Sequence, residues 1–407
     1  MTTKAIVVGA GLGGLTAAAS LHRRGIDTVV LEQSSQLGEI GAGVQLAPNA
    51  LKVLRALGLE QRASELGFEP DAHVVRNWKT SEVLAYTPYK GALREAFGAD
   101  YFGYHRADLH ELLRSAVPRD AIRLSARCTG VREEGGQAIV ELADGSELAG
   151  DVVVGADGIH SRVRASLFGE AEPRYTGNAC WRGMTPVSAL PPGLIAPDMT
   201  VWFGPGASVV HYYIRGGEFI NWMAAFESDK WAEESWTAEG TREEAVGRFA
   251  DWHPTIQALI SKSDRYLKWG LFDRDPLPQW SQGRITLMGD ACHPMLPYLA
   301  QGACMALEDG YAVADAIAAG SNDMAAALGA YEQARRERTA RVQLLARTRS
   351  IENHLRDEAS MRARDERFAR IRAQAATGQH AYGIEWIYEH DVTAPHHTIH
   401  PAQEVLP

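Results

Sequence analysis

A glycine motif near the N-terminus constrains the fold more than any other feature of the sequence. Residues 4–8 form a short β-rich run, and a G-x-G-x-x-G motif follows at once with Gly9, Gly11 and Gly14. The helix-forming segment 15–24 comes next, and a second β-rich run covers residues 28–32. A strand, a helix and a strand within about 30 residues are typical of a right-handed parallel crossover. We therefore predict a Rossmann-like α/β domain at the N-terminus.

The spacing of this motif suits a bound dinucleotide. It lets the chain turn sharply and brings the backbone, with the free N–H groups of the following helix, against a pyrophosphate. Glu32 ends the second run, where its carboxylate can accept hydrogen bonds from ribose hydroxyls and would repel a 2′-phosphate. A tight turn without a ligand is the simpler alternative, but the flanking elements and Glu32 argue against it. The domain is thus predicted to bind NAD or FAD.

Length, charge and cysteine content exclude several classes of protein. The chain has 407 residues, enough for two or three domains, and its formal net charge of -10 is the wrong sign for binding a phosphate backbone. Its 4 cysteines lack a paired C-x-x-C spacing, so we expect no zinc ribbon or disulfide framework. The apolar stretch 5–21 is too rich in glycine for a signal peptide and too short for a membrane span. We expect a cytoplasmic protein without nucleic acid or membrane partners.

The rest of the chain divides into regions of different sequence pattern. Residues 137–142 and 147–154 read as strands around an Asp-Gly turn, and aromatic-rich strand candidates between about 175 and 272 predict an inserted antiparallel sheet. Residues 284–290 return to the pattern of a strand running into glycine, and a helix is predicted over 301–319. These changes predict four regions. The first part of the nucleotide-binding domain covers 1–174, and a substrate domain covers 175–275. The first domain resumes over 276–350, and a helical C-terminal region with a tail covers 351–407.

Four further motifs accompany the glycine motif in a fixed order. They are Glu39-x-Gly41-Ala-Gly43-Val44-Gln45, Arg106-x-Asp108-Leu109, Gly155-Ala-Asp157-Gly158 and Gly289-Asp290-Ala-x-His293-Pro294. With them, the sequence from about residue 4 to about residue 350 resembles the single-component FAD-dependent aromatic hydroxylases, a family that includes salicylate hydroxylase, 3-hydroxybenzoate 6-hydroxylase and 6-hydroxynicotinate 3-monooxygenase. The resemblance implies a glutathione-reductase-like FAD-binding domain with an inserted antiparallel-sheet substrate domain.

The resemblance also implies the cofactors. FAD is expected to contact a set of residues spread over these motifs: Gly9, Gly11, Gly14, Glu32, Gln45, Arg106, Asp157, Asp290, Gly302 and Ala303. NADH or NADPH would be the reductant, with NADH favoured, and O2 would react through a flavin hydroperoxide. Because a single dinucleotide fingerprint is present, the flavin would have to swing outward to meet the nicotinamide.

The substrate pocket is expected between the inserted sheet and the loop after Asp290. The implied catalytic residues are Tyr212 and His211, and the implied substrate contacts are Arg182, Tyr212, Trp222, Pro297 and Tyr298. Relatives carry a histidine base where Ser208 stands here, and a serine cannot replace it. On a strand, residues 208, 210 and 212 share one face and His211 points to the other. Tyr212 is therefore the stronger candidate for substrate contact. His211 is either a base or an ordinary buried or edge histidine.

The resulting functional hypothesis is a monooxygenase that hydroxylates a small phenolic or N-heteroaromatic acid, with or without loss of the carboxylate. Two alternatives stay open: an FAD monooxygenase of a larger or non-acidic phenol, and a flavin protein that senses redox state without turnover. Arg182 would separate the first two by pairing with a carboxylate, although a structural salt bridge at the domain junction is equally compatible. Partners would be the aromatic acid and O2, and a homodimer is left open. The C-terminal histidines His390, His396, His397 and His400 are interrupted by proline, so no metal site is expected.

Overall fold

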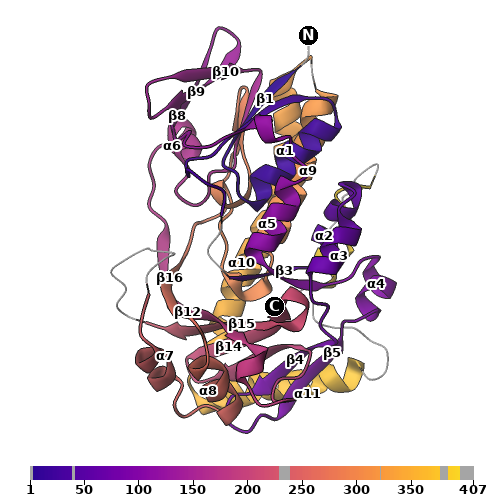
Figure 1. Ribbon diagram of the computed structural model, residues 1–407, viewed down its shortest axis with the longest axis vertical. Coiled ribbons are helices and arrows are strands. Elements are labelled where there is room, and N and C mark those ends of the chain that lie inside the picture. The colour runs from indigo at the N-terminus through magenta and orange to yellow at the C-terminus, as the bar shows by residue number, and fades with distance from the viewer. Residues whose placement is uncertain (1–2, 39–41, 229–238, 321, 376–383, 395–407) are drawn as a thin grey trace.

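The computed structural model describes residues 3–38, 42–228, 239–320, 322–375 and 384–394. Figure 1 shows two lobes stacked along the long axis, with the N-terminus in one lobe and the seven-stranded sheet in the other. Glu39 and Gly41, and the histidines His396, His397 and His400, lie outside the described residues. None of the helices in the described ranges has the length and apolar character that a bilayer crossing requires.

The first lobe, here called the nucleotide lobe, is built on a six-stranded sheet. Its order is β17-β18-β11-β1-β2-β7, and every pairing except β17 with β18 is parallel. The strands are β1 (Lys4–Val8), β2 (Asp27–Leu31), β7 (Ile122–Arg123), β11 (Val152–Gly155), β17 (Ser281–Gln282) and β18 (Ile285–Leu287). Helix α1 (Leu12–Arg23) packs against this sheet, and α9 (Gly302–Ala319) packs beside α1. The apolar runs of the central strands are buried.

The second lobe, the sheet lobe, contains a seven-stranded sheet of order β16-β12-β15-β14-β13-β4-β5. Its strands are β4 (Ala72–Asn77), β5 (Val83–Pro88), β12 (Arg174–Pro186), β13 (Met199–Gly204), β14 (Ala207–Ile214), β15 (Phe219–Glu227) and β16 (Leu267–Asp273). The sheet therefore extends beyond the predicted insertion, because β4 and β5 come from the first region of the chain. It is also mixed, since β4 pairs with β13 in parallel. The hairpin of β4 and β5 covers what would otherwise be the open edge of β13.

The predicted strand 147–154 divides into two strands in different sheets. β10 (Glu147–Gly150) joins β8 (Cys128–Glu134) and β9 (Gln137–Leu142) in a three-stranded sheet, while β11 belongs to the nucleotide lobe. The division falls at Asp151, which exchanges hydrogen bonds with the backbone of Lys4 at 2.8 Å through both its own N–H and its carboxylate. This pair fixes the point at which the chain leaves one sheet and enters the next. A short pair, β3 (Gly43–Leu46) with β6 (Phe102–His105), lies between the lobes.

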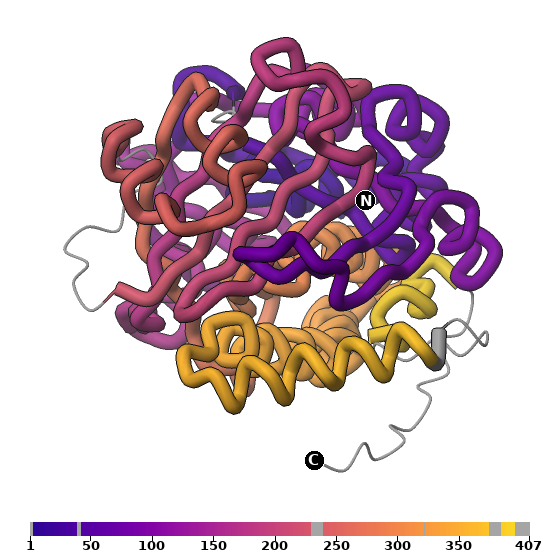
Figure 2. Tube along the Cα trace, turned by 90° about the horizontal axis from the view of Figure 1, so that it is seen from below, coloured from indigo at the N-terminus to yellow at the C-terminus, as the bar shows by residue number. Residues whose placement is uncertain are grey.

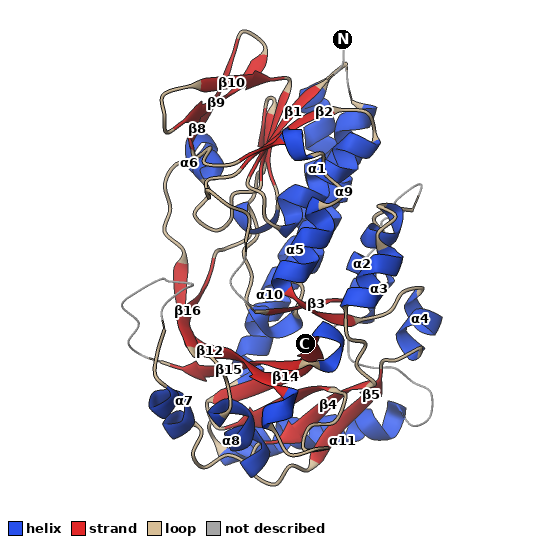
Figure 3. Ribbon diagram, in the orientation of Figure 1, coloured by secondary structure: helices blue, strands red, loops and turns tan. Residues whose placement is uncertain are grey.

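The remaining helices surround these sheets, as the colouring by secondary structure in Figure 3 shows. They are α2 (Pro48–Ala56), α3 (Glu60–Leu66), α4 (Ala92–Phe97), α5 (Arg106–Arg114), α6 (Arg162–Phe168), α7 (Arg242–Arg248), α8 (Pro254–Ser261), α10 (Met324–Asn353), α11 (Glu358–Ala375) and α12 (Glu385–Glu389). Short 3-10 turns cover Gly289–Ala291 and Pro297–Leu299. The long helix α10 runs from the nucleotide lobe to the sheet lobe, and Figure 2 shows α11 crossing beside the hairpin of β4 and β5.

A buried ion network joins α9 to α10. Arg335 on α10 donates to Glu308 at 2.5 Å and to Asp309 at 2.8 Å, and each of these side chains is at most 1% exposed. Arg338 adds a second guanidinium beside Glu308 at 2.9 Å. Burial alone would raise the pKa of Glu308, but the two arginines hold it well below its usual value. Removing one partner of such a network leaves a buried charge without compensation.

We predict that Arg335→Ala lowers the free energy of unfolding by roughly 3–5 kcal/mol, because two buried carboxylates lose a shared partner. Chemical denaturation followed by circular dichroism measures the change. The neighbouring variant Arg336→Ala is the control, since Arg336 is 48% exposed and its ion pair with Glu332 joins residues one helical turn apart. Its loss should cost less than about 0.5 kcal/mol.

The pH dependence gives a second readout of the same network. The pKa values of Glu308 and Asp309 are lower in the folded protein than in the unfolded chain, where they are about 4. Each group therefore stabilises the folded protein fully at pH values above its unfolded pKa. That contribution is lost as the pH falls below this value. The stability difference between wild type and Arg335→Ala should therefore narrow below about pH 4. A difference that stays constant down to acid denaturation would show that lost packing, and not charge, causes the destabilisation.

Candidate cofactor and substrate site

A cavity of about 360 Å³, here called the junction cavity, lies where the two lobes meet. Its walls include the starts of two helices, Gly11 to Gly13 at α1 and Gly302 with Ala303 at α9. The residues that precede these helices, Gly11 and Gln301, form no side-chain cap. The backbone N–H groups of two first turns are thus left for another acceptor, and both helix dipoles favour negative charge at this place.

The glycines of the N-terminal motif have separate structural roles. A β-carbon at Gly14 would lie 2.0 Å from the carbonyl oxygen of Gly9, so Gly14 is required for the packing of α1 on β1. A β-carbon at Gly11, in contrast, would meet no protein atom within 4 Å and would project into the junction cavity. The lack of a side chain at Gly11 therefore serves a ligand, and a pyrophosphate at the helix start fits this cradle.

Glu32 supports the motif from the end of β2. Its carboxylate accepts hydrogen bonds from the backbone N–H of Ala10 at 3.0 Å and of Ser34 at 2.9 Å. Glu32 is half-buried beside the glycine turn and does not line the junction cavity itself. This position fixes a carboxylate next to the turn, where the resemblance implies that it meets a ribose.

Opposite charges face the junction cavity from two elements. Arg106 begins α5, and its backbone N–H donates to the carbonyl of Ala42 at 2.8 Å. Asp290 lies in the 3-10 turn after β18, and its exposed side chain lines the junction cavity. The protein surrounds the cavity, so desolvation raises the pKa of Asp290. Burial lowers the pKa of Arg106, and Arg182 contributes to the same direction. A carboxylate and a guanidinium in this place suit a ligand that carries both hydroxyl groups and phosphates.

Asp157 is held by the helix that follows it. Its two carboxylate oxygens accept hydrogen bonds from the hydroxyl of Ser161 at 2.5 Å and from the backbone N–H of Arg162 at 2.7 Å, at the start of α6. The neighbouring Ala156 and Gly158 line the junction cavity, whereas Asp157 does not. Its geometry is that of a cap that shapes the loop, and a direct contact of its carboxylate with FAD stays a prediction.

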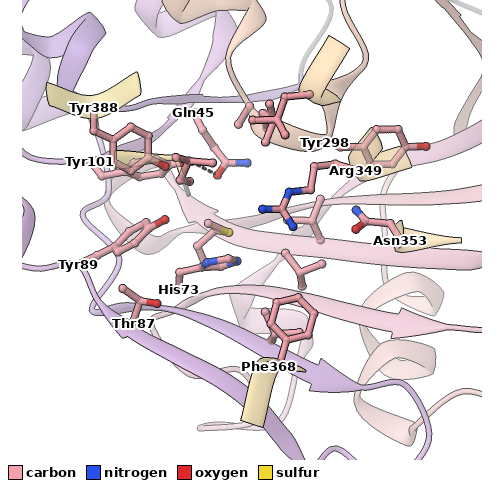
Figure 4. A pocket seen from close by; sticks show the side chains of 18 of the residues that line it. Gln45, His73, Thr87, Tyr89, Tyr101, Tyr298, Arg349, Asn353, Phe368 and Tyr388 are labelled. Carbon is pink, nitrogen blue, oxygen red and sulfur yellow. Dashed lines mark hydrogen bonds between the residues drawn. The ribbon is translucent and has the colours of Figure 1, made fainter. Parts of the chain in front are cut away.

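A second cavity, of about 430 Å³ and here called the apolar cavity, lies next to the first (Figure 4). The two share part of their walls, contributed by Gln45, Val210, Met223, Pro297 and Ala300. Gln45 stands at the boundary on β3 and accepts a hydrogen bond from the hydroxyl of Tyr101 at 2.6 Å. A ring bound in the apolar cavity would therefore lie beside whatever group fills the nearer end of the junction cavity.

Segments that are distant in the sequence line the apolar cavity. Strands β4 and β5, helices α10, α11 and α12, and the loop after β18 all contribute. The polar side chains among them include His73, Thr87, Ser208, Tyr298, Arg349 and Asn353. No motif in the sequence marked His73, Thr87, Arg349 or Asn353 as site residues. Their only sequence signal is a polar residue next to apolar neighbours, which is too common to identify a site.

The predicted substrate residues separate into two groups. Tyr298 lines the apolar cavity, Tyr212 and Arg182 line the junction cavity, and Pro297 lies in the wall that the two share. Arg182 donates to the carbonyl of Gly43 at 2.7 Å and lies over the ring of Trp269 at 5.1 Å. This arrangement ties the sheet lobe to β3 through a hydrogen bond and a ring contact, whereas the structural alternative considered from the sequence was a salt bridge.

Strand alternation places Trp222 and His211 elsewhere. Asn221 and Met223 line the junction cavity, so Trp222 between them points to the opposite face, where it is fully buried near Tyr266. The prediction that Trp222 contacts the substrate is therefore wrong. His211 also faces that side and accepts a hydrogen bond from the indole N–H of Trp202 at 3.0 Å. Burial lowers the pKa of His211 to about 3, and neither residue lines a described cavity.

The fold and this cradle define a protein with a Rossmann-like dinucleotide site. The chain belongs to the FAD binding domain family, which its residues 2–347 match. It is 40% identical over 359 residues to 3-amino-4-hydroxybenzoate 2-monooxygenase from Streptomyces platensis, with 88% of this chain and 90% of that protein covered. It is 37% identical over 343 residues to 6-hydroxynicotinate 3-monooxygenase from Pseudomonas fluorescens, with 84% and 89% covered.

Solved structures agree with this assignment. HpxO from Klebsiella pneumoniae, in complex with FAD and uric acid, superposes with a TM-score of 0.84 at 28% identity, covering 95% of this chain and 96% of that one. Salicylate hydroxylase in complex with its substrate, at 24% identity and a TM-score of 0.80 over 96% of both chains, shares the fold. The resemblance inferred from the motifs is thus confirmed, and the chain is an FAD-dependent monooxygenase.

We predict that Gly11→Ala lowers the flavin content of the purified protein without loss of fold. The added methyl group meets no protein atom but occupies the phosphate cradle. Losing a hydrogen bond to a charged group costs roughly 1.5–3 kcal/mol, so FAD affinity should fall at least about tenfold. Flavin absorbance per protein measures the loss, and far-UV circular dichroism checks the fold.

Gly329→Ala is the matched control, because a β-carbon there also meets nothing within 4 Å but lies on the exposed surface of α10. It should retain the wild-type flavin content. Wild-type flavin content in Gly11→Ala would remove Gly11 from the cofactor site.

Proposed function

We propose that this monooxygenase hydroxylates a small aromatic acid, with NADH or NADPH as reductant and O2 as oxidant. The observation that carries the proposal is the apolar cavity, which shares a wall with the junction cavity and contains the guanidinium of Arg349. The names of the relatives add support, since they act on aminohydroxybenzoate, hydroxynicotinate and hydroxybenzoate. A cytoplasmic setting, where NADH is supplied, follows from the same proposal.

The lining of the apolar cavity suits an aromatic ring. Apolar and aromatic side chains from both sides enclose it, among them Val201, Val210, Phe203 and Phe368. Such walls bind the ring by burial and keep water away from the reacting carbon. When bound, FAD supplies the hydride acceptor and the activation of O2, and the chain supplies the position of the ring.

Arg349 provides a counter-charge for a carboxylate. It lies on α10, and Figure 4 shows its guanidinium pointing into the cavity between Gln45 and His73. One of its terminal nitrogens donates to Glu352 at 2.8 Å. A guanidinium presents five N–H donors in a planar fork, so it can hold Glu352 and a substrate carboxylate together. Arg349 is therefore a stronger candidate for the carboxylate anchor than Arg182, which lies on the cofactor side.

The proposal is tested on the purified yellow protein with a panel of compounds. NADH oxidation, O2 uptake and product are measured with 3-hydroxybenzoate, 4-hydroxybenzoate, salicylate, 6-hydroxynicotinate and phenol. We expect hydroxylated product from at least one acid and slower turnover of phenol. Turnover of neutral phenols with no acid accepted would instead favour the non-acidic alternative, and absence of ligand-stimulated NADH oxidation would favour a flavin protein without turnover.

We predict that Arg349→Met lowers kcat/KM for the best acid by about 10–100-fold, the equivalent of a charged hydrogen bond of roughly 1.5–3 kcal/mol. The value for phenol should change less than about threefold, because phenol carries no carboxylate. Arg182→Met is the comparison, and it should reduce flavin content or stability while preserving the preference for acids. Loss of the preference for acids in Arg182→Met, but not in Arg349→Met, would instead identify Arg182 as the anchor of the substrate carboxylate.

We predict that Tyr212→Phe uncouples NADH oxidation from hydroxylation. The Tyr212 side chain is buried in the wall of the junction cavity, where its hydrogen-bond partner Gln45 also borders the apolar cavity. Losing one hydrogen bond of about 1 kcal/mol should misplace the ring and increase hydrogen peroxide released per NADH about fivefold. Tyr213→Phe is the control, because its hydroxyl donates to Ile195 at 2.8 Å, away from both cavities. Equal coupling in the two variants would exclude Tyr212 from the site.

A further inference from the structure

His73 occupies a cavity position on β4 that shares a row of the sheet with Tyr212. Met199 on β13 pairs with His73, and the next residue, Thr200, pairs with His211. Met199 therefore lies between His73 and Tyr212 in the same register. Residues opposite each other on neighbouring strands point to the same face, so His73 faces the cavities as Tyr212 does.

The ring of His73 points into the apolar cavity, where it lies near the guanidinium of Arg349 (Figure 4). Its ring centroid lies 5.9 Å from that of Tyr89, which borders the same cavity. Among the described residues that line the apolar cavity, His73 is the single imidazole. A substrate whose carboxylate is bound at Arg349 would therefore lie within reach of the imidazole.

The other ionisable groups around this cavity are less suited to accept a proton. Glu352 on α10 is paired with Arg349 at 2.8 Å and with Arg367 of α11 at 3.0 Å. Tyr101 and Tyr388 have pKa values raised by burial, so they stay protonated, and Glu385 lies at the α12 end of the lining. Ser208 is a hydroxyl 3.4 Å from the imidazole of His354, which is also bonded to Asn178.

We propose that His73 is the catalytic base, which accepts the proton of a ring hydroxyl while Arg349 holds the carboxylate of the same substrate. The inference rests on the proposed function and narrows its substrate class to aromatic acids that also carry a hydroxyl group. Proton transfer to the imidazole makes the ring more electron-rich before oxygen is inserted.

The protons and electrons of this step balance. One atom of O2 forms the new C–O bond, and the ring carbon that receives it loses its hydrogen as a proton. The other oxygen atom leaves as water. NADH and H+ supply the two electrons and two protons that this requires, and the proton lost from the ring carbon balances the one on the new hydroxyl group. The proton held by His73 returns to the phenolate oxygen, so the residue ends each cycle neutral.

Arg349 also makes the base depend on the substrate. Burial, together with the nearby charge of Arg349, lowers the pKa of His73 to about 4, so the free enzyme holds a neutral imidazole. A substrate carboxylate bound at Arg349 offsets that positive charge and removes one of the two causes. The imidazole therefore becomes a stronger base once an acid is bound. A neutral phenol lacks the ion pair with Arg349 and also leaves His73 a weaker base, so its turnover is disfavoured twice.

The test uses the holoenzyme, the variant His73→Gln and the chromophoric probe 4-hydroxy-3-nitrobenzoate. Glutamine can accept a hydrogen bond but cannot take the proton. Absorbance difference spectra, corrected for flavin, give both the affinity of the probe and the fraction bound as phenolate across pH. We expect affinity within about threefold of wild type, because Arg349 is intact, and an ionisation midpoint of the bound probe about one pH unit higher in the variant.

Turnover supplies the second readout. With the best acid of the panel, His73→Gln should lower kcat for product at least tenfold while KM changes less than threefold. His253→Gln is the matched control, because His253 caps α8 away from the apolar cavity, and it should leave both readouts unchanged.

Three outcomes would overturn the proposal: an unchanged probe midpoint in His73→Gln, unchanged kcat, or the same loss in His253→Gln. If the wild type hydroxylates no acid, the proposed function fails instead. The midpoint of the bound probe then still decides whether His73 takes the proton.

Discussion

The carboxylate of Asp309 holds together the elements on which both cavities depend. It accepts the backbone N–H of Gly289 at 3.0 Å, contacts the imidazole of His293 at 2.5 Å, and receives the guanidinium of Arg335 at 2.8 Å. One fully buried group thus fixes the Asp290 turn, the middle of α9 and α10 at Arg335 relative to one another. Arg349 lies fourteen residues after Arg335 on α10, about 21 Å along a helix that is already anchored at the cofactor end. The placement of a substrate anchor in the other lobe follows from that rigidity.

The cofactor half of the molecule could be predicted from the sequence because its signals are local. Gly9, Gly11 and Gly14 lie within six residues, and their spacing is dictated by a helix start against a strand. The alternation that separates Tyr212 from His211 is equally local, since it depends on the two-residue period of one strand. The same period, applied to β15, would have moved Trp222 off the cavity face between Asn221 and Met223.

The substrate half could not be predicted in this way. His73, Arg349 and Tyr388 come from β4, α10 and α12, and they meet only because the chain returns three times to one place. Pairing of β4 with β13 joins segments more than a hundred residues apart and leaves no periodic pattern in either. A polar residue in such a strand is indistinguishable in sequence from one that faces solvent. The extension of the sheet by β4 and β5 has the same origin.

The wall of the apolar cavity combines residues inside the matched family range with residues beyond it. The match to the FAD binding domain family ends at residue 347, yet Arg349, Phe368, Ile384 and Tyr388 all contribute to the cavity wall. Lys52 of α2 donates to the backbone carbonyls of Tyr388 and Glu389, so the last described helix is docked through its main chain. A segment held by its backbone can exchange side chains without losing its place. Side chains of this segment can therefore change the shape of the apolar cavity while the residues that line the junction cavity stay the same.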